Sequence, residues 1–447
     1  MRRNANNCII TTEGPVSPRR TASQASRLGA TFFIANLFLL TTAGSNGSDA
    51  CDWPQILGPN RNGIAIGEKI LNSLPENGLK KKWSHPVGEG YAGPTVSKDR
   101  VIIFHRQNSQ QWAECLSLRD GSVIWKTELP AKYRSGGIDS DRGPKAVPLI
   151  HQDKVYLFDA AGELFCLSMD DGKLIWTRSA ASDFRAPPGY FGFGSSPIAI
   201  GDSLIVNVGG NDAGVVAFDL DDGKTQWVAS DQRASYSSPA AITLNDKEHL
   251  LLVTRLKFLV IDPSQGNIIY ETEFGDRGPT VNAAIPVSAN DQIFLTASYG
   301  IGARLLAPLA TELKEIWSDR DNFESQYSTP LFYEGKLYGT SGREDRQNGS
   351  YRCIDFGSGK LNWTEENFPV GHSILVGRRI VVLDHTGNLH ILEATPKKFA
   401  RSYQTRLFDA PSRAIPAIAN GNLLARSNFT QGKAELACFE IGETKND

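Results

Sequence analysis

The chain has 447 residues and a formal net charge of −2, so charge gives no case for nucleic acid as a main partner. Hydrophobic residues make up 40% of the chain and charged residues 21%, which is ordinary for a soluble globular protein. This length usually indicates two or three domains, but stacked repeats can form one unit of this size, so repeats are considered before domains.

Residues 1–44 are predicted to be a signal or targeting segment, followed by an N-terminal extension over 45–79. Arginines precede an apolar run over 28–40, and small residues follow it, which is the order of a secretory signal. The apolar run is too short for a membrane span, and no other stretch approaches one. We therefore expect a secreted, periplasmic or cell-envelope protein, with lipid anchoring at Cys51 as a weaker alternative.

Residues 80–443 repeat one strand–turn–strand signature. In most copies a glycine turn is followed four residues later by an aromatic residue that ends a short strand. Glycine adopts the positive φ of a tight hairpin turn without steric cost. The spacing of the copies suits one four-stranded blade per unit. The aromatic ends are Trp125, Trp176, Trp227, Tyr270, Trp317 and Trp363.

A proline that opens a short apolar stretch is a second marker of each unit. Seven units have it, and the eighth expected position, near Ser373, lacks it. The two markers together predict an all-β fold, an eight-bladed β-propeller of four-stranded antiparallel blades. The last unit offers three strands, so we expect the N-terminal strand ending at Trp83 to close the ring. The prolines are Pro94, Pro148, Pro197, Pro239, Pro286, Pro330 and Pro416.

The repeats resemble the PQQ-type β-propeller family. The run Ala217-Phe218-Asp219, with Gly223 and Trp227, is similar to the tryptophan-docking motif of that family, and residues 52–63 resemble the N-terminal signature of secreted BamB-like or PQQ-binding-like propellers. The family includes quinoprotein alcohol dehydrogenases, which hold PQQ in the ring centre, and the non-catalytic outer-membrane assembly lipoprotein BamB. The resemblance implies that Trp83 and the six repeat aromatics are structural docking residues that pack between blades.

Four cysteines and two histidines invite a metal-site interpretation that we do not favour. None of the cysteines has CxxC spacing, and they take the place of alanine in the docking motif, so we expect buried free thiols. His385 and His390 flank a turn with only Asp384 beside them, so turn polarity explains them better than a metal. The cysteines are Cys115, Cys166, Cys353 and Cys438.

The loops that join the outer strand of one blade to the next proline are the candidate functional face. Two of them are long, 126–146 and 177–195. A funnel lined by aromatic residues and arginines suits an anionic or planar ligand, or a peptide. The alternative is that these loops only pack and solvate the face. The candidate ligand- or partner-binding residues are Tyr91, Arg142, Tyr190, Phe193, Tyr236, Tyr327, His372 and Arg413.

No catalytic or metal-binding residue is predicted. The chain has no adjacent cysteine pair, no compact acidic cluster, no phosphate loop and no nucleophile motif. The resemblance therefore favours a non-catalytic binding or assembly scaffold like BamB, with envelope or secreted proteins as partners and no cofactor. Two alternatives stay open: a divergent PQQ-dependent dehydrogenase, which would need PQQ with Ca²⁺, and a polymer- or carbohydrate-binding module.

Overall fold

The computed structural model describes residues 52–135, 141–244, 246–310 and 312–443. The predicted targeting segment and Cys51 lie outside the described residues. All described residues belong to one compact unit, Gly47–Asp447. No helix among them is long and apolar enough to cross a membrane.

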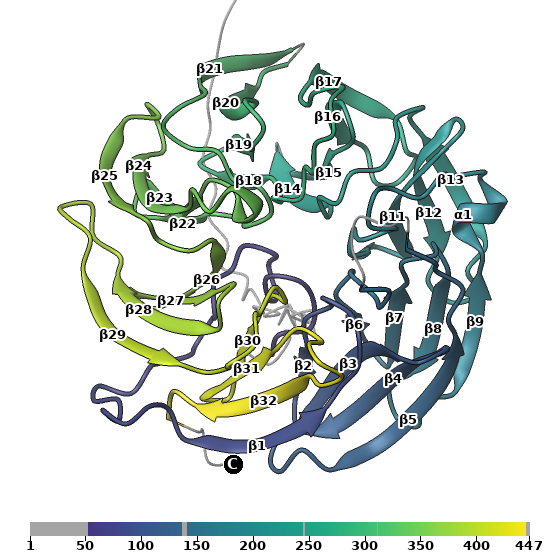
Figure 1. Cartoon of the computed structure of the whole chain (residues 1–447). Coiled ribbons are helices and arrows are strands. Elements are labelled where there is room, and N and C mark those ends of the chain that lie inside the picture. Colours follow the sequence, from purple (N-terminus) through teal and green to yellow (C-terminus); the bar gives the residue numbers. More distant parts are fainter. Residues whose placement is uncertain (1–51, 136–140, 245, 311, 444–447) are drawn as a thin grey trace, which may run out of the picture. The chain divides into compact units, whose positions relative to one another are not determined.

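Eight four-stranded antiparallel sheets follow one another around a ring, which confirms the predicted eight-bladed propeller (Figure 1). Blade 1 contains β2 (Thr95–Ser97), β3 (Arg100–Gln107), β4 (Gln110–Ser117) and β5 (Val123–Pro130). Blade 2 contains β6 (Leu149–His151), β7 (Lys154–Phe158), β8 (Leu164–Ser168) and β9 (Leu174–Arg178). Blade 3 contains β10 (Ile198–Ile200), β11 (Ser203–Gly210), β12 (Ala213–Asp219) and β13 (Thr225–Ala229). Blade 4 contains β14 (Ala240–Leu244), β15 (Lys247–Val253), β16 (Lys257–Ile261) and β17 (Ile268–Glu273).

The other four blades repeat this order from the inner to the outer strand. Blade 5 contains β18 (Val287–Ala289), β19 (Gln292–Ala297), β20 (Gly302–Pro308) and β21 (Leu313–Asp319). Blade 6 contains β22 (Leu331–Tyr333), β23 (Lys336–Ser341), β24 (Ser350–Asp355) and β25 (Leu361–Glu366). Blade 7 contains β26 (Gly371–Val376), β27 (Arg379–Asp384), β28 (Asn388–Glu393) and β29 (Arg401–Arg406). Blade 8 contains β30 (Ala417–Ala419), β31 (Asn422–Arg426), β32 (Glu435–Glu440) and β1 (Lys81–Pro86).

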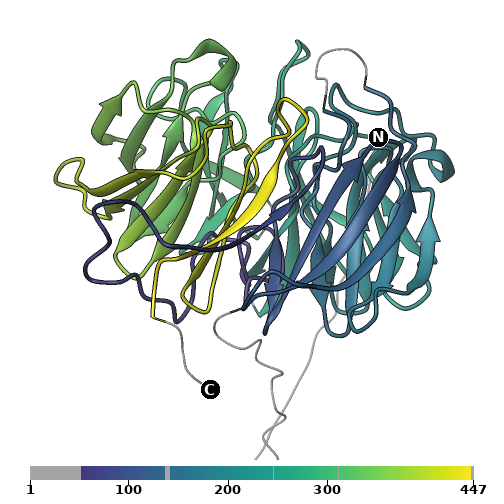
Figure 2. The ribbon, with the colours of Figure 1, turned by 60° about the horizontal axis from the view of Figure 1, so that its bottom comes forward.

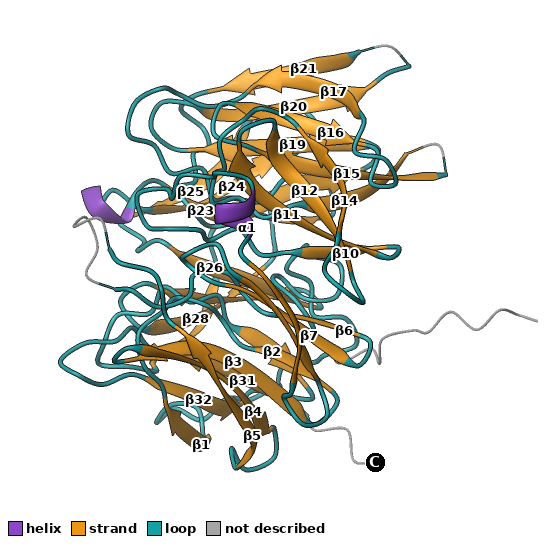
Figure 3. Ribbon diagram, turned by 90° about the vertical axis from the view of Figure 1, so that its right-hand side faces the viewer, coloured by secondary structure: helices purple, strands orange, loops and turns teal. Residues whose placement is uncertain are grey.

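The burial of each strand depends on its position in the blade, and its residue types follow that burial. The second and third strands are covered by neighbouring blades on both faces, so β27 reads as a nearly continuous run of buried Val, Ile and Leu. The outer strands are edge strands and expose most of their residues, as in β5, where only Trp125 and Leu129 are buried. Among the described residues, helix is confined to α1 (Ala180–Asp183) and the 3₁₀ turn η1 (Glu344–Arg346), as Figure 3 shows.

The ring closes through the N-terminal strand, as the sequence predicts. β1 pairs antiparallel with β32, so that Trp83 lies opposite Cys438, and Figure 2 shows the three C-terminal strands of this blade in yellow. Side-chain hydrogen bonds also stabilise this closure. Arg426 of β31 is fully buried and donates from its guanidinium to the carbonyl oxygens of Ala92 (3.0 Å) and Gly88 (2.8 Å), which lie beyond β1. Strand pairing and these hydrogen bonds therefore join the two ends of the described chain.

Each repeat tryptophan spans the seam to the next blade. The indole nitrogen donates to a backbone carbonyl oxygen at 2.8–3.1 Å in all six cases. In five of the six, all but Trp363, the ring lies against the turn glycine of that next blade, as Trp125 does on Gly172. The tyrosine of blade 4 bonds through its hydroxyl to Leu309 O. The indole pairs are Trp83 to Leu118, Trp125 to Met169, Trp176 to Leu220, Trp227 to Pro263, Trp317 to Phe356 and Trp363 to Thr395.

Blade 7 also has a docking aromatic, Tyr403, which the repeat pattern does not reveal. Tyr403 lies opposite Ile391, in the position that tryptophan takes in other blades, and its hydroxyl donates to Pro75 O at 3.0 Å. Four cysteines occupy the strand position opposite a docking tryptophan. All four are buried and free, which confirms that prediction, and burial raises the pKa of the Cys115 thiol to about 12.

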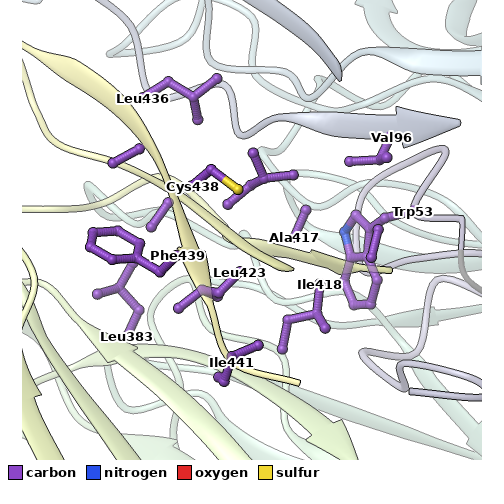
Figure 4. Packing of buried hydrophobic residues seen from close by; sticks show 14 of the residues in the cluster. Trp53, Val96, Leu383, Ala417, Ile418, Leu423, Leu436, Cys438, Phe439 and Ile441 are labelled. Carbon is purple, nitrogen blue, oxygen red and sulfur yellow. The ribbon is translucent and has the colours of Figure 1, made fainter. Parts of the chain in front are cut away.

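The segment over residues 53–65 lies inside the ring of inner strands. Trp53 bridges to Val96 of blade 1, and Figure 4 shows its indole beside Ile418 of blade 8. Arg61 is buried and donates to the carbonyl oxygens of Ser196 and Pro197 of blade 3. Further along, Ala65 donates its amide to an inner-strand carbonyl of blade 7. The segment that carries the predicted N-terminal signature is therefore an axial core element.

Candidate functional site

The centre of the predicted loop face is held by an ion pair. The Arg413 guanidinium, from the loop between blades 7 and 8, binds both carboxylate oxygens of Glu344, with Nη2 2.7 Å from Oε1 and Nε 3.0 Å from Oε2. Arg413 also donates through Nη1 to the hydroxyl of Tyr91 at 3.2 Å, in the loop between blades 8 and 1. A planar guanidinium suits this two-point contact with a carboxylate. The site therefore joins three blades through one arginine.

Tyr327 and His372 extend this cluster to two further loops. The Tyr327 hydroxyl donates to Glu344 Oε2 at 2.9 Å, and its ring centroid lies 5.3 Å from that of His372. His372 Nε2 lies 3.0 Å from Arg413 O, which only accepts, so this nitrogen carries the proton. Burial lowers the pKa of His372 to about 4, so the imidazole is neutral at pH 7. We call Tyr91, Tyr327, Glu344, His372 and Arg413 the central cluster.

A second ion pair flanks Tyr91. Lys145 Nζ lies 2.6 Å from Asp141 Oδ1 and 4.4 Å from the centroid of the Tyr91 ring. Asp141 also accepts the backbone N–H of Gly90 at 2.8 Å, so the pair fixes the loop that carries Tyr91. The neighbouring Arg142 binds Glu89 at 2.8 Å on the exposed side.

The remaining predicted residues lie around the loop between blades 2 and 3. Tyr190 is 42% exposed, and the Tyr236 hydroxyl accepts the backbone N–H of Phe191 at 2.7 Å. Phe193 is buried, and its ring packs against Phe158 at 5.5 Å between centroids. Phe193 therefore supports the core beneath this loop and does not line an open funnel. The structure brings Tyr91, Tyr327, His372 and Arg413 of the predicted residues into one cluster.

Glu344 is the cluster member that the sequence does not reveal. It lies in η1, inside the connection between β23 and β24, whereas the candidate residues were sought between the outer strand and the next proline. The available signal is the length of this connection, which is an irregular insertion within one blade. A carboxylate on such an insertion is a natural partner for an arginine in a neighbouring loop.

The donor set of the central cluster does not suit PQQ with Ca²⁺. PQQ carries three carboxylates and needs uncommitted cations, but Arg413 is bound to Glu344 and Lys145 to Asp141. Burial opposes the charge on Arg413, but the hydrogen bonds to Glu344 outweigh it and raise its pKa. Across the described ranges, no group of three or more His, Cys, Asp or Glu side chains is placed to hold a metal ion.

Comparison with known proteins identifies one family. The family model described as outer membrane protein assembly factor BamB matches residues 109–365. The BamB protein of Alkalilimnicola ehrlichii is 27% identical over 214 residues, which are 47% of this chain and 50% of that protein. The BamB protein of Escherichia coli K12 is 23% identical over 267 residues, which are 55% of this chain and 62% of that protein. The chain thus spans less than two thirds of either relative.

Solved structures show the same fold. BamB from Moraxella catarrhalis superposes with a TM-score of 0.58 at 15% identity, covering 81% of this chain and 100% of that chain. A europium-containing methanol dehydrogenase superposes with a TM-score of 0.67 at 13% identity, covering 88% of this chain and 98% of that chain. At these identities the likeness shows the fold alone, because one propeller fold carries both kinds of protein.

Proposed function

We propose, on the premise that this chain belongs to the family of the outer membrane protein assembly factor BamB, that it is a non-catalytic binding scaffold of the cell envelope. The family model matches more than half of the chain, and relatives of two bacterial genera carry that name. We expect its partners to be envelope or secreted proteins that dock on the loop face.

The observation that carries this proposal is that the cations of the central cluster and of the ion pair beside it are neutralised within the chain. Arg413 and Lys145, two cations at the centre of the face, each bind a carboxylate of the same chain. A general acid or base needs a pKa near the working pH, but burial holds the pKa of His372 near 4 and that of Tyr327 well above 10. A rigid, charge-matched surface suits recognition of another protein better than acid–base or redox chemistry.

Two exposed aromatic residues on the predicted loop face suit a protein partner, and one of them, Phe429, lies next to a residue that contacts the central cluster. Phe429 is 38% exposed and follows Asn428, whose side-chain oxygen accepts the backbone N–H of Arg413 at 3.0 Å. Tyr190 is 42% exposed on the same predicted loop face. Aromatic side chains and arginines are the residues that most often dominate protein–protein binding energy. We therefore place the docking surface on Tyr190, Phe429 and the exposed edge of Arg413.

A cofactor experiment separates this proposal from the dehydrogenase alternative. The full chain is mixed with PQQ and Ca²⁺, passed through a desalting column, and assayed by quinone absorbance and by dye reduction with alcohols or sugars. The proposal predicts no retained quinone and no dye reduction above a protein-free control. Retained quinone together with substrate-dependent dye reduction would establish an oxidoreductase and overturn it.

A further inference from the structure

A pocket of about 170 Å³ lies in the seam between blades 4 and 5. Its walls include Leu244 and Ile269 of blade 4, and Asp291 and Leu309 of blade 5. All four residues lie at or beside the first or third connection of a blade, which is the end opposite the loops of the central cluster. An apolar cavity of about 150 Å³ can hold benzene, so the pocket has room for about one aromatic ring.

The docking residue of this seam is Tyr270, where six other seams have a tryptophan. Tyr270 lies opposite Val260, just as Trp227 lies opposite Ala217 in the preceding blade. Its hydroxyl donates to Leu309 O, in the way that an indole N–H donates to a turn carbonyl in the other seams. A phenol ring is smaller than an indole, so the tyrosine leaves space in this seam that a tryptophan would take.

A hydrogen bond that ties two turns together in other blades is replaced in blade 5. In blades 1, 2, 3 and 6, the residue whose carbonyl accepts the docking tryptophan also donates its amide to the turn between the first two strands, as Leu118 does to Asp99 O at 2.7 Å. The equivalent Leu309 donates to Glu312 O at 2.8 Å, within its own turn. Asp291, the counterpart of Asp99, therefore borders an open pocket.

The pocket combines an apolar wall with a hydrogen-bond acceptor. Ile269 and Leu309 line it and are exposed, and the exposed Ile268 and Ile316 lie on the neighbouring outer strands β17 and β21 (Figure 1). Asp291 is exposed too, and within the described part of the chain its carboxylate has no hydrogen bond or ion pair. Such a site suits a planar apolar group that carries one N–H donor.

We propose that this pocket binds a tryptophan side chain of a protein partner, whose indole takes the space beside Tyr270 and donates its N–H to the Asp291 carboxylate. The chain itself fills six other seams with this group, so the shape and polarity of an indole suit this position. The exposed aliphatic residues extend beyond the area of one ring, which favours a partner surface over a free aromatic molecule. This interface lies at the other end of the blades from the proposed docking surface, so the two stand or fall separately.

Methyl NMR of the full chain tests the proposal directly. The isoleucine δ1 methyl groups are labelled with ¹³C, and the protein is titrated with N-acetyltryptophanamide, its 1-methylindole analogue or N-acetylleucinamide. We expect a saturable ring-current shift of the Ile269 signal with N-acetyltryptophanamide, and weaker binding of the analogue, which lacks the N–H. The signal is assigned by its loss in Ile269→Val. No shift with N-acetyltryptophanamide, or equally tight binding of N-acetylleucinamide, would overturn the proposal.

Two pairs of variants locate the site. Asp291→Gly is expected to weaken N-acetyltryptophanamide binding at least fivefold, whereas Asn290→Gly should leave it unchanged. Both residues have a positive φ in the same turn, 57° and 53°, which glycine adopts without strain, and Asn290 does not line the pocket. Tyr270→Trp supplies the indole from within the chain and should abolish binding, whereas the same change at Tyr403 should not. Equal effects within the first pair would contradict the assigned site, even if Tyr403→Trp does not fold.

A pair of peptides separates a protein partner from a free aromatic molecule. Two pentapeptides carry a central tryptophan, flanked by leucines in one and by glycines in the other. The exposed Ile268, Leu309 and Ile316 predict at least threefold tighter binding of the leucine-flanked peptide. Equal affinities of both peptides and N-acetyltryptophanamide would show that the pocket recognises the ring alone, and would overturn the assignment to a protein partner.

Discussion

At the scale of single residues, the turn glycines that contact the docking tryptophans are needed for two reasons, a positive φ and the lack of space for a Cβ. Gly172 has a φ of +69°, and a Cβ there would lie 2.5 Å from an atom of the Trp125 ring. Gly201 also has a positive φ, +56°, but a Cβ there would meet nothing within 4 Å. The pair separates the cost of backbone strain from the cost of steric overlap.

We predict that Gly172→Ala destabilises the protein more than Gly201→Ala does. Backbone strain alone costs about 1 kcal/mol, and overpacking against the indole adds about 1–3 kcal/mol. Urea denaturation of the two variants measures the difference in the free energy of unfolding. Equal losses would show that the indole contact at the seam is unimportant.

His372 predicts a pH dependence of stability. Its pKa is lowered to about 4 in the folded protein from an ordinary value of 6.5, so between these values the unfolded chain binds the extra proton. The neutral imidazole makes its full contribution to the free energy of unfolding above pH 6.5. This contribution falls by about 3 kcal/mol in all as the pH drops toward 4. Chemical denaturation at pH 7 and pH 4.5 should show a smaller difference for His372→Gln than for the parent. An unchanged difference would contradict the assigned burial.

At the scale of elements, repetition explains what the sequence predicts and what it misses. The blades and the closing strand are predictable because the same turn and the same aromatic recur locally. The repeat pattern does not reveal Tyr403, because this residue docks on Pro75 of the N-terminal extension and no glycine turn precedes it. The path of residues 53–65 and the position of Glu344 depend on contacts between distant segments, which leave no local pattern.

The closing strand gives the prediction at this scale. Deleting residues 80–84 removes most of the pairing of β1 with β32 and the docking of Trp83, and it leaves β32 as an open edge. We expect a loss of several kcal/mol and a markedly lower melting temperature, with association through the exposed edge. Calorimetry and analytical ultracentrifugation measure the two effects. A melting curve like that of the parent would mean that the ring does not depend on this strand.

At the scale of the whole molecule, the residues that stand out in the sequence stabilise the fold, and the residues of the proposed function lie on the loops that connect the strands. Tryptophans, cysteines and the axial segment hold blades together, whereas the central cluster and the exposed aromatics lie on connecting loops. Part of the candidate face could be predicted, because the order of the blades determines which loops lie next to one another. Arg413 and Tyr91 meet as that order implies, but the carboxylate that neutralises Arg413 comes from inside a blade.

The affinity for a partner tests the central claim most directly. The main envelope protein that crosslinks to the full chain is purified, and its Kd is measured for the parent and for the double variant Tyr190→Ala/Phe429→Ala. The control variant, Ile175→Ala, removes a side chain that is 46% exposed on the outer strand β9. A loop-face scaffold predicts at least tenfold weaker binding by the double variant, with unchanged melting and no effect in the control. Equal affinity of all three proteins would contradict it.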